Sequence, residues 1–142
     1  MQKTRQGRAL VALAALLLFS SAAIVNAAAQ AKEKDAEYAK KGRALYVQYC
    51  VSCHGPSGKG DGPAASALKV PPADLTNVSR KYNGFPAEKM MDYINGEKYA
   101  IGHGSREMPV WGKRFRQSKG GEAPALGEIY ALTKYLESVQ KK

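Results

Sequence analysis

Two stretches of the chain carry apolar residues at helical spacing, and a turn-rich middle separates them. In residues 36–49 the apolar side chains recur every three or four positions, and the charged ones fall mostly off that stripe. This period predicts an amphipathic helix, with Asp35 as its N-cap. Residues 128–139 predict a second such helix, followed by two lysines, whose charge suits a helix C-terminus. The stripes consist of Tyr38, Gly42, Leu45, Tyr46 and Tyr49 in the first helix and of Ile129, Leu132, Tyr135, Leu136 and Val139 in the second.

A glycine occupies the apolar stripe of the first predicted helix. In a helix interior, glycine is less favourable than alanine by about 1 kcal/mol, so Gly42 needs a compensating reason. A second helix that crosses closely at this position would supply it. We therefore expect the two terminal helices to pack on each other near Gly42.

The residues between these helices are rich in glycine and proline. Residues 55–72 contain too many of both for a helix, which predicts a fixed loop. A short helix is expected from Pro86 to Asn95, with Pro86 in its first turn and Gly96 at its end. A second loop follows over residues 101–112. No run of alternating or β-branched residues is long enough for a buried strand, so the pattern predicts an all-α fold.

The first 31 residues have the organisation of a secretory signal peptide. Three basic residues precede an apolar stretch at residues 9–19, and small residues follow it. This order predicts export to the periplasm and cleavage after Ala27, Ala29 or Ala31. The alternative is an uncleaved membrane anchor over residues 9–25, a length at the lower edge of a bilayer span. Much of that stretch is alanine and serine, which favours cleavage.

Cleavage would leave residues 32–142, the length of a single domain. The whole chain has 22 basic and 12 acidic residues and a formal net charge of +10, and its first 31 residues hold three of the basic and none of the acidic ones. The remainder stays strongly basic, which predicts partners with acidic docking surfaces and permits peripheral association with an anionic membrane. Nucleic acid is not expected as a partner, because the basic residues are scattered along an exported chain. We expect a monomer.

The most specific motif is Cys50-Val51-Ser52-Cys53-His54, which has the C-x-x-C-H spacing of a covalent c-type haem site. Thiols at i and i+3 face one side of a helical turn and can add across the two vinyl groups of one haem, while the adjacent imidazole reaches the iron. Other uses of these cysteines fit less well. A structural zinc needs four ligands, and the second histidine, His103, is far along the chain. A thioredoxin-like redox pair would be expected near a βαβ pattern, and the sequence has no run suited to a buried strand. A structural disulfide across so short a loop would stabilise the fold little.

A second iron ligand is expected from the loop before the last helix. A methionine paired with a histidine raises the reduction potential of an electron-transfer haem. Met108 is the leading candidate, because Pro109 restrains its backbone within an M-P-x-W-G sequence. Met90 and Met91 fall in the middle of the predicted short helix, where methionine commonly fills gaps in a core. His103 is the competing ligand, and we interpret it as a surface or loop-bracing histidine.

With these motifs the chain resembles a small bacterial monohaem class I cytochrome c. The likeness covers essentially all of residues 32–142. C-x-x-C-H is its strongly specific element and M-P-x-W-G a moderately specific one. Weaker matches occur in the order typical of the family, at Gly42, Tyr46, residues 60–63, residues 72–76, Leu132 and Tyr135.

The resemblance implies an all-α cytochrome c fold, in which N- and C-terminal helices cross near Gly42 around a covalently bound haem. It implies that Cys50 and Cys53 hold the haem by thioether bonds and that His54 and Met108 are the axial iron ligands. A loop carbonyl near Pro63 would orient the His54 imidazole. Residues 114–126 depart from the family, because this stretch is longer and more basic than usual.

The function expected from these features is one-electron transfer in the periplasm, by a carrier with one haem c and no enzymatic activity. An iron with six ligands has no open position for chemistry, and the sequence assembles no acid, base or nucleophile. The alternatives are a haem-containing electron-entry subunit of a larger redox complex and, if Met108 does not bind the iron, a haem enzyme or sensor with an open distal site.

Overall fold

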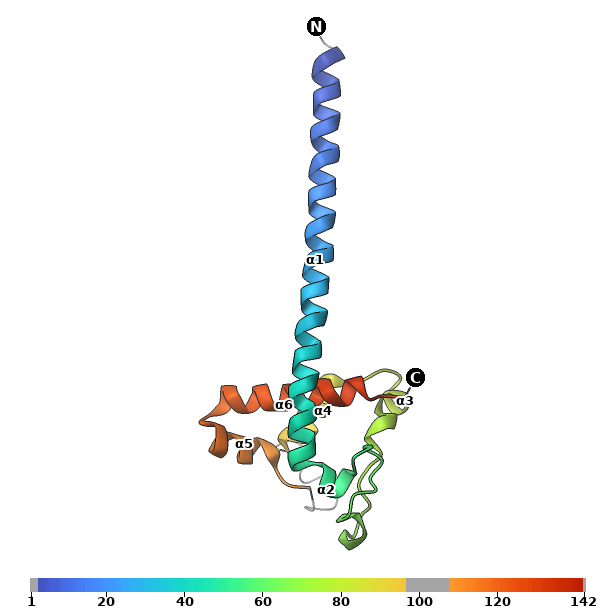
Figure 1. The fold of residues 1–142 in the computed structure, drawn as a ribbon, viewed down its shortest axis with the longest axis vertical. Helices are drawn as coiled ribbons and strands as arrows, with labels where there is room; N and C mark the ends of the chain where they lie inside the picture. Colours follow the sequence, from blue (N-terminus) through green and yellow to red (C-terminus); the bar gives the residue numbers. More distant parts are fainter. Residues whose placement is uncertain (1–2, 97–107, 142) are drawn as a thin grey trace. The chain divides into compact units, whose positions relative to one another are not determined.

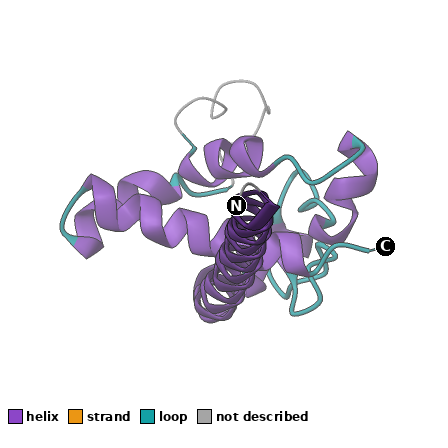
Figure 2. Cartoon of the chain, turned by 90° about the horizontal axis from the view of Figure 1, so that it is seen from above, coloured by secondary structure: helices purple, strands orange, loops and turns teal. Residues whose placement is uncertain are grey.

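The structure is a computed structural model that describes residues 3–96 and 108–141, and every regular element in this part of the chain is helical (Figures 1 and 2). The all-α prediction is therefore confirmed. The longer helices are α1 (Lys3–Tyr49), α4 (Ala87–Asn95), α5 (Trp111–Lys119) and α6 (Glu122–Ser138). The short ones are α2 (Val51–His54), α3 (Val78–Tyr82) and the 3-10 turns η1 (Ala65–Ala67) and η2 (Leu75–Asn77).

The first helix is longer than its apolar stripe predicts. Asp35 lies inside α1 and not at its N-cap, so that prediction is wrong. The sequence from residue 27 to residue 41 contains neither glycine nor proline and is rich in Ala, Lys and Glu, which favour helix, so nothing ends the helix there. The chain forms two compact units, one up to Asp35 and one from Ala36 onward. Among the residues that the structure describes, no helix is long and apolar enough to cross a bilayer. Cleavage within the first unit stays a prediction.

The last helix also begins earlier than predicted, at Glu122 instead of residue 128. Pro124 and Gly127 suggest a break in the sequence, but both fit the helix. Proline is tolerated in a first turn, where the missing N–H would have no partner in the helix. Gly127 lies where nothing approaches the position of a side chain.

Helix α5 was not predicted from the sequence. It occupies much of the basic stretch that departs from the family pattern, and it ends at Gly120, which has a left-handed φ of 83°. Trp111 and Phe115, four residues apart, are both buried on one face of α5, which leaves Lys113 and Arg114 exposed. The helix therefore adds buried aromatic side chains to the core and a basic surface outside it.

The core of the second unit lies where α6 runs across the last turns of α1 (Figure 1). A side-chain Cβ at Gly42 would overlap the backbone oxygen of Ala131, so the two backbones are almost in contact there. The close crossing predicted from Gly42 is thus confirmed. Around it the Tyr46 and Tyr135 rings lie 5.1 Å apart between centroids. Helices α4 and α5 pack on α6. Helix α4 ends at Gly96 as predicted, but Pro86 is its N-cap residue and does not lie in its first turn.

Candidate functional site

A cavity of about 560 Å³ lies in the second unit, and the residues singled out from the sequence meet there. This volume is within the range of roughly 300–1,000 Å³ that is typical of cofactor pockets. Its walls are mostly apolar and aromatic, and Cys50, Cys53, His54 and Met108 all line it. The structure thus brings the four predicted haem-binding residues to one cavity, whereas the bonds that they would form stay predictions.

The two cysteines and the histidine share a single helical turn. The Cys50 amide continues the ladder of α1 by donating to the Tyr46 oxygen at 2.9 Å, and the His54 amide donates to the Cys50 oxygen at 2.8 Å. Both cysteines are free thiols and half-buried. The spacing C-x-x-C-H therefore places its three reactive side chains together on one turn.

The loop after this turn holds the motif in place through its backbone. Amides of the loop donate to the oxygens of Ser52, Cys53 and His54 at 2.8, 3.1 and 2.9 Å. Gly62 passes so close to the α2 backbone that a Cβ there would lie 2.5 Å from the Ser52 oxygen. The glycine-rich loop predicted for residues 55–72 is thus confirmed, and the close approach at Gly62 explains why it contains glycine.

The Cys50 thiol is held in its neutral form by its surroundings. Burial raises the pKa of the Cys50 thiol to about 12, and the nearby Cys53 adds to the rise. Reactive redox cysteines have the opposite property, because the attacking species is the thiolate and its environment lowers the pKa. A neutral, half-buried thiol fits a residue that is consumed once in a covalent bond.

The His54 ring is held by a carbonyl oxygen, though not the one that the resemblance implies. Its Nδ1 lies 3.2 Å from the Ala73 oxygen, so the prediction of a carbonyl near Pro63 is wrong. Because a carbonyl can only accept, Nδ1 carries the proton and the lone pair remains on Nε2. Burial lowers the pKa of His54, against the smaller opposite effect of this hydrogen bond, so the neutral form needed for metal binding is favoured.

Tyr46 fixes the far end of the motif. Its ring is buried, and its hydroxyl donates to the Gly55 oxygen at 2.7 Å. Burial is the main cause of a raised pKa at Tyr46, so the hydroxyl remains a donor. Together with Ala73, this tyrosine is a functional contact that sequence reasoning missed. The period of the first helix shows that Tyr46 faces the core, but not which carbonyl its hydroxyl reaches.

The candidate methionines are placed differently from one another. Met108 lines the cavity with 44% of its surface exposed, and Pro109 and Trp111 line it beside Met108. Met90 is buried on α4, as predicted for a core residue, but it also lines the cavity. His103 lies outside the described residues. Met90 is consequently the methionine that competes with Met108, an alternative that helical position alone did not reveal.

An aromatic wall separates part of the cavity from the basic surface of α5. Trp111 and Tyr49 both line the cavity, with ring centroids 5.2 Å apart. The Arg114 guanidinium carbon lies 5.3 Å from the Trp111 centroid and 6.0 Å from that of Tyr49, within the range of a cation–π contact. A positive charge is therefore held against rings that also form the wall of the site.

These residues fit a haem better than a bare metal ion. Two thiols, an imidazole and a thioether in an apolar cavity are the groups that a c-type haem requires. In the part of the chain that the structure describes, no cluster of three or more His, Cys, Asp or Glu side chains is placed to hold a metal ion. Asn77 is one of the residues that line the cavity, and its side-chain Oδ1 is buried with no hydrogen-bond partner.

Comparison with known proteins agrees with this geometry. The family model described as cytochrome c oxidase, cbb3-type, subunit III matches residues 37–123. The match begins in α1, includes the C-x-x-C-H turn and Met108, and ends at the start of α6. No curated protein and no solved structure gives a significant match to the chain.

Proposed function

The chain belongs to this family of cytochrome c domains, and on that premise we propose that it transfers single electrons through one haem attached at Cys50 and Cys53. The observation that carries the proposal is the meeting of both thiols, His54 and Met108 in one apolar cavity. When bound, the haem supplies an iron that cycles between two oxidation states. The chain's own residues attach it, hold its two faces and keep water away.

Each residue has a separate part in this proposal. The Cys50 and Cys53 thiols would hold the haem by thioether bonds, and His54 and Met108 would be the ligands of its iron. The Ala73 oxygen fixes the His54 ring and strengthens it as a donor, as outer-shell acceptors do for metal-binding histidines. The buried rings of Tyr46 and Trp111 contribute apolar walls. Because the protein would supply both iron ligands and leave no position open for a substrate, the proposed activity is electron transfer and not catalysis.

The two cavity methionines provide a direct test of the iron ligands. Met108→Ala should abolish the weak absorption band near the red end of the visible spectrum, which is typical of haem iron with a methionine ligand. The band is lost because water or an open position would replace the thioether. Met90→Leu is the matched control and should keep the band, since leucine fills the same core position. Absorption spectra of both purified oxidised proteins are the measurement.

The opposite pattern would move the axial ligand to α4. If Met90→Leu abolishes the band and Met108→Ala retains it, Met90 is the ligand. If His103→Ala alone changes the low-spin spectrum, the site is a bis-histidine one. Purified wild-type protein without covalently bound haem would overturn the proposed function itself.

We propose the periplasm as the compartment of this carrier. The support is the predicted signal peptide in the first 31 residues. The family description also favours a second role, as an electron-entry subunit of a larger redox complex. Both roles would use the same site, so the site does not distinguish them. A free carrier should purify alone, as the expected monomer, whereas a subunit of a complex should purify together with other chains.

The basic surface beside the cavity is the proposed docking site for an acidic redox partner. Lys113 and Arg114 are exposed on α5, close in sequence to the exposed apolar side chains of Met108 and Val110. Arg116, on the same helix, instead pairs with Glu122 at 3.3 Å. An apolar centre with charged residues beside it suits transient association, in which the charges raise the encounter rate.

Ferricyanide, a small anionic oxidant, tests this surface without a known partner. Lys113→Gln with Arg114→Gln should slow oxidation of the reduced protein by about tenfold at low salt, because two positive charges that attract the anion are lost. The rates should converge above about 0.1 M salt, where the Debye length is about 10 Å. Stopped-flow measurement over a range of salt concentrations gives both results.

The matched control removes the same charges elsewhere. Lys40→Gln with Arg43→Gln changes one lysine and one arginine on the exposed face of α1, and neither lines the cavity. Its rate should stay close to that of the wild type. Equal slowing in both double variants would mean that net charge acts and that α5 is not the docking surface.

A further inference from the structure

One wall of the cavity is a short segment that the protein holds from two sides. Ala73, Asp74, Leu75, Asn77 and Val78 all line the cavity. The segment is folded on itself by Asp74, whose carboxylate accepts from the Thr76 amide at 2.8 Å and from the Thr76 hydroxyl at 2.6 Å. This arrangement caps the turn η2. Here residues 73–79 are called the cavity wall.

On one side the cavity wall is bonded to the haem-attachment motif. The Ala73 oxygen lies 3.2 Å from Nδ1 of His54. The Leu75 amide donates to the oxygen of Gly58, in the loop after the motif, at 2.7 Å. The position of the wall therefore determines where the acceptor for the proposed iron ligand lies.

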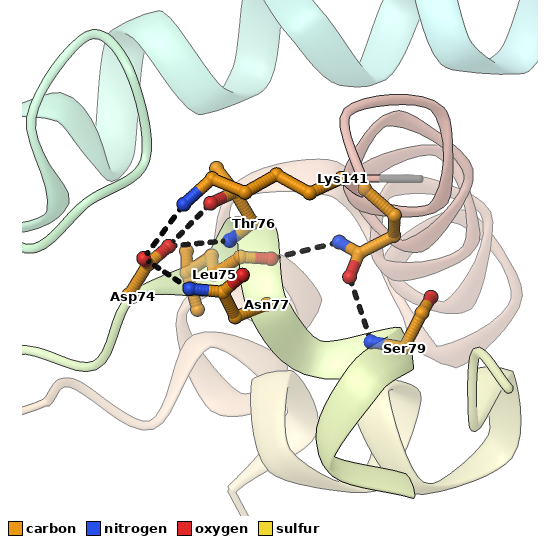
Figure 3. A network of polar contacts seen from close by, with 7 residues as sticks. Asp74, Leu75, Thr76, Asn77, Ser79 and Lys141 are labelled. Atoms are coloured by element: carbon orange, nitrogen blue, oxygen red, sulfur yellow. Dashed lines mark hydrogen bonds and ion pairs between the residues drawn. The ribbon is translucent and has the colours of Figure 1, made fainter. Parts of the chain in front are cut away.

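On the other side the wall is bonded to the end of the chain (Figure 3). The Gln140 amide group uses both of its ends there: Nε2 donates to the Leu75 oxygen at 2.7 Å, and Oε1 accepts from the Ser79 amide at 2.8 Å. The next residue adds two contacts, from its amide to the Thr76 oxygen at 2.9 Å and from Lys141 Nζ to Asp74 at 3.4 Å.

Gln140 is tied to α6 as well as to the wall. Its Nε2 also donates to the oxygen of Leu136, at 2.7 Å, in the last turns of α6. Leu136 itself lines the cavity. One side chain thus joins two walls of the site, and among side chains only a primary amide has the two N–H donors and the acceptor oxygen that these three contacts use.

We propose that Gln140 is a positioning residue for His54, acting through the cavity wall on the hydrogen bond between Nδ1 and the Ala73 oxygen. This inference rests on the proposed function. A firm acceptor makes the imidazole a stronger donor to a metal, and a stronger donor favours the oxidised state of the iron. Release of the wall should therefore raise the reduction potential.

The test compares haem-loaded wild-type protein with Gln140→Leu, which keeps most of the side-chain volume and removes the amide. The expected result is an upward shift of the reduction potential and faster hydrogen exchange of the Ser79 amide, with unchanged haem content. Ser138→Ala is the matched control. It removes a 2.7 Å hydrogen bond to the Tyr135 oxygen at the same end of α6 without touching the wall. Its potential should equal that of the wild type.

Two results would overturn the inference. One is a Gln140→Leu potential equal to the wild-type value in protein that still carries haem and shows faster Ser79 exchange. The other is a hydrogen-exchange result on the wild type and needs no variant. If the Ser79 and Lys141 amides exchanged freely while the Leu75 amide stayed protected, the cavity wall would keep its position without its hydrogen bonds to Gln140 and Lys141. Wild-type protein that carries no haem would instead count against the proposed function, so the two failures are distinguishable.

Discussion

Replacing both cysteines, as Cys50→Ser with Cys53→Ser, is expected to yield a protein that lacks covalent haem and does not fold stably. The substitutions themselves are small, and both positions are only half-buried. The large effect comes from the cavity of about 560 Å³ that the haem would no longer fill. Without the haem, the mostly apolar residues that line this space would face water or leave a void, and a typical domain has only about 5–15 kcal/mol of stability to offset such a loss.

Haem staining after denaturing electrophoresis and circular dichroism measure the two parts of this result. Ser52→Ala is the control within the motif, since Ser52 lies between the cysteines and is exposed. It should keep both haem and fold. A compact, cooperatively unfolding double variant without haem would contradict the prediction and would show that the helices alone form a sufficient core.

The parts of the site that could be predicted from sequence are those fixed by local spacing. Cys50, Cys53 and His54 lie on one helical turn, so their relation follows from the helix period alone. Gly42 was informative for a different reason: a glycine on an apolar helical stripe is unfavourable unless something packs against it. Both inferences need no knowledge of how distant parts of the chain meet.

The parts that could not be predicted depend on contacts between distant residues. The Ala73 oxygen reaches a histidine 19 positions away, and Gln140 reaches the wall across 61 and 65 positions. Backbone carbonyls are present at every residue, so nothing in the sequence marks Ala73 as the acceptor. Met90 was identified as a core residue, but its place in the cavity depends on how α4 packs against α6.

Errors at helix ends have a local physical cause. Asp35 has a side chain suited to an N-cap, yet the residues before it favour helix strongly enough that no cap is needed. Pro124 and Gly127 suggest a break, yet one lies in a first turn and the other where it meets nothing. In each case the residue type permits two structures, and its neighbours decide between them.

Gly42→Ala is expected to destabilise the protein by up to about 2 kcal/mol, although alanine is the better helix former. The gain in helix propensity is about 1 kcal/mol. Against it, the new Cβ would overlap the Ala131 backbone oxygen and lie 2.9 Å from Cβ of Tyr135. Overpacking typically costs about 1–3 kcal/mol, and backbone atoms relieve it less easily than a flexible side chain does. Thermal unfolding of the haem-loaded protein, monitored by circular dichroism, measures the net change in stability from these two effects.

The same substitution at Gly127 is expected to change stability in the opposite direction, so Gly127→Ala is the matched control. Gly127 lies within α6, the helix that Gly42 contacts, and nothing lies within 4 Å of an added Cβ there. Gly127→Ala should therefore raise stability by up to about 1 kcal/mol, since only the propensity term remains. If both variants unfolded at or above the wild-type temperature, α1 and α6 would not cross at Gly42, and the packing that encloses the cavity would have to be different.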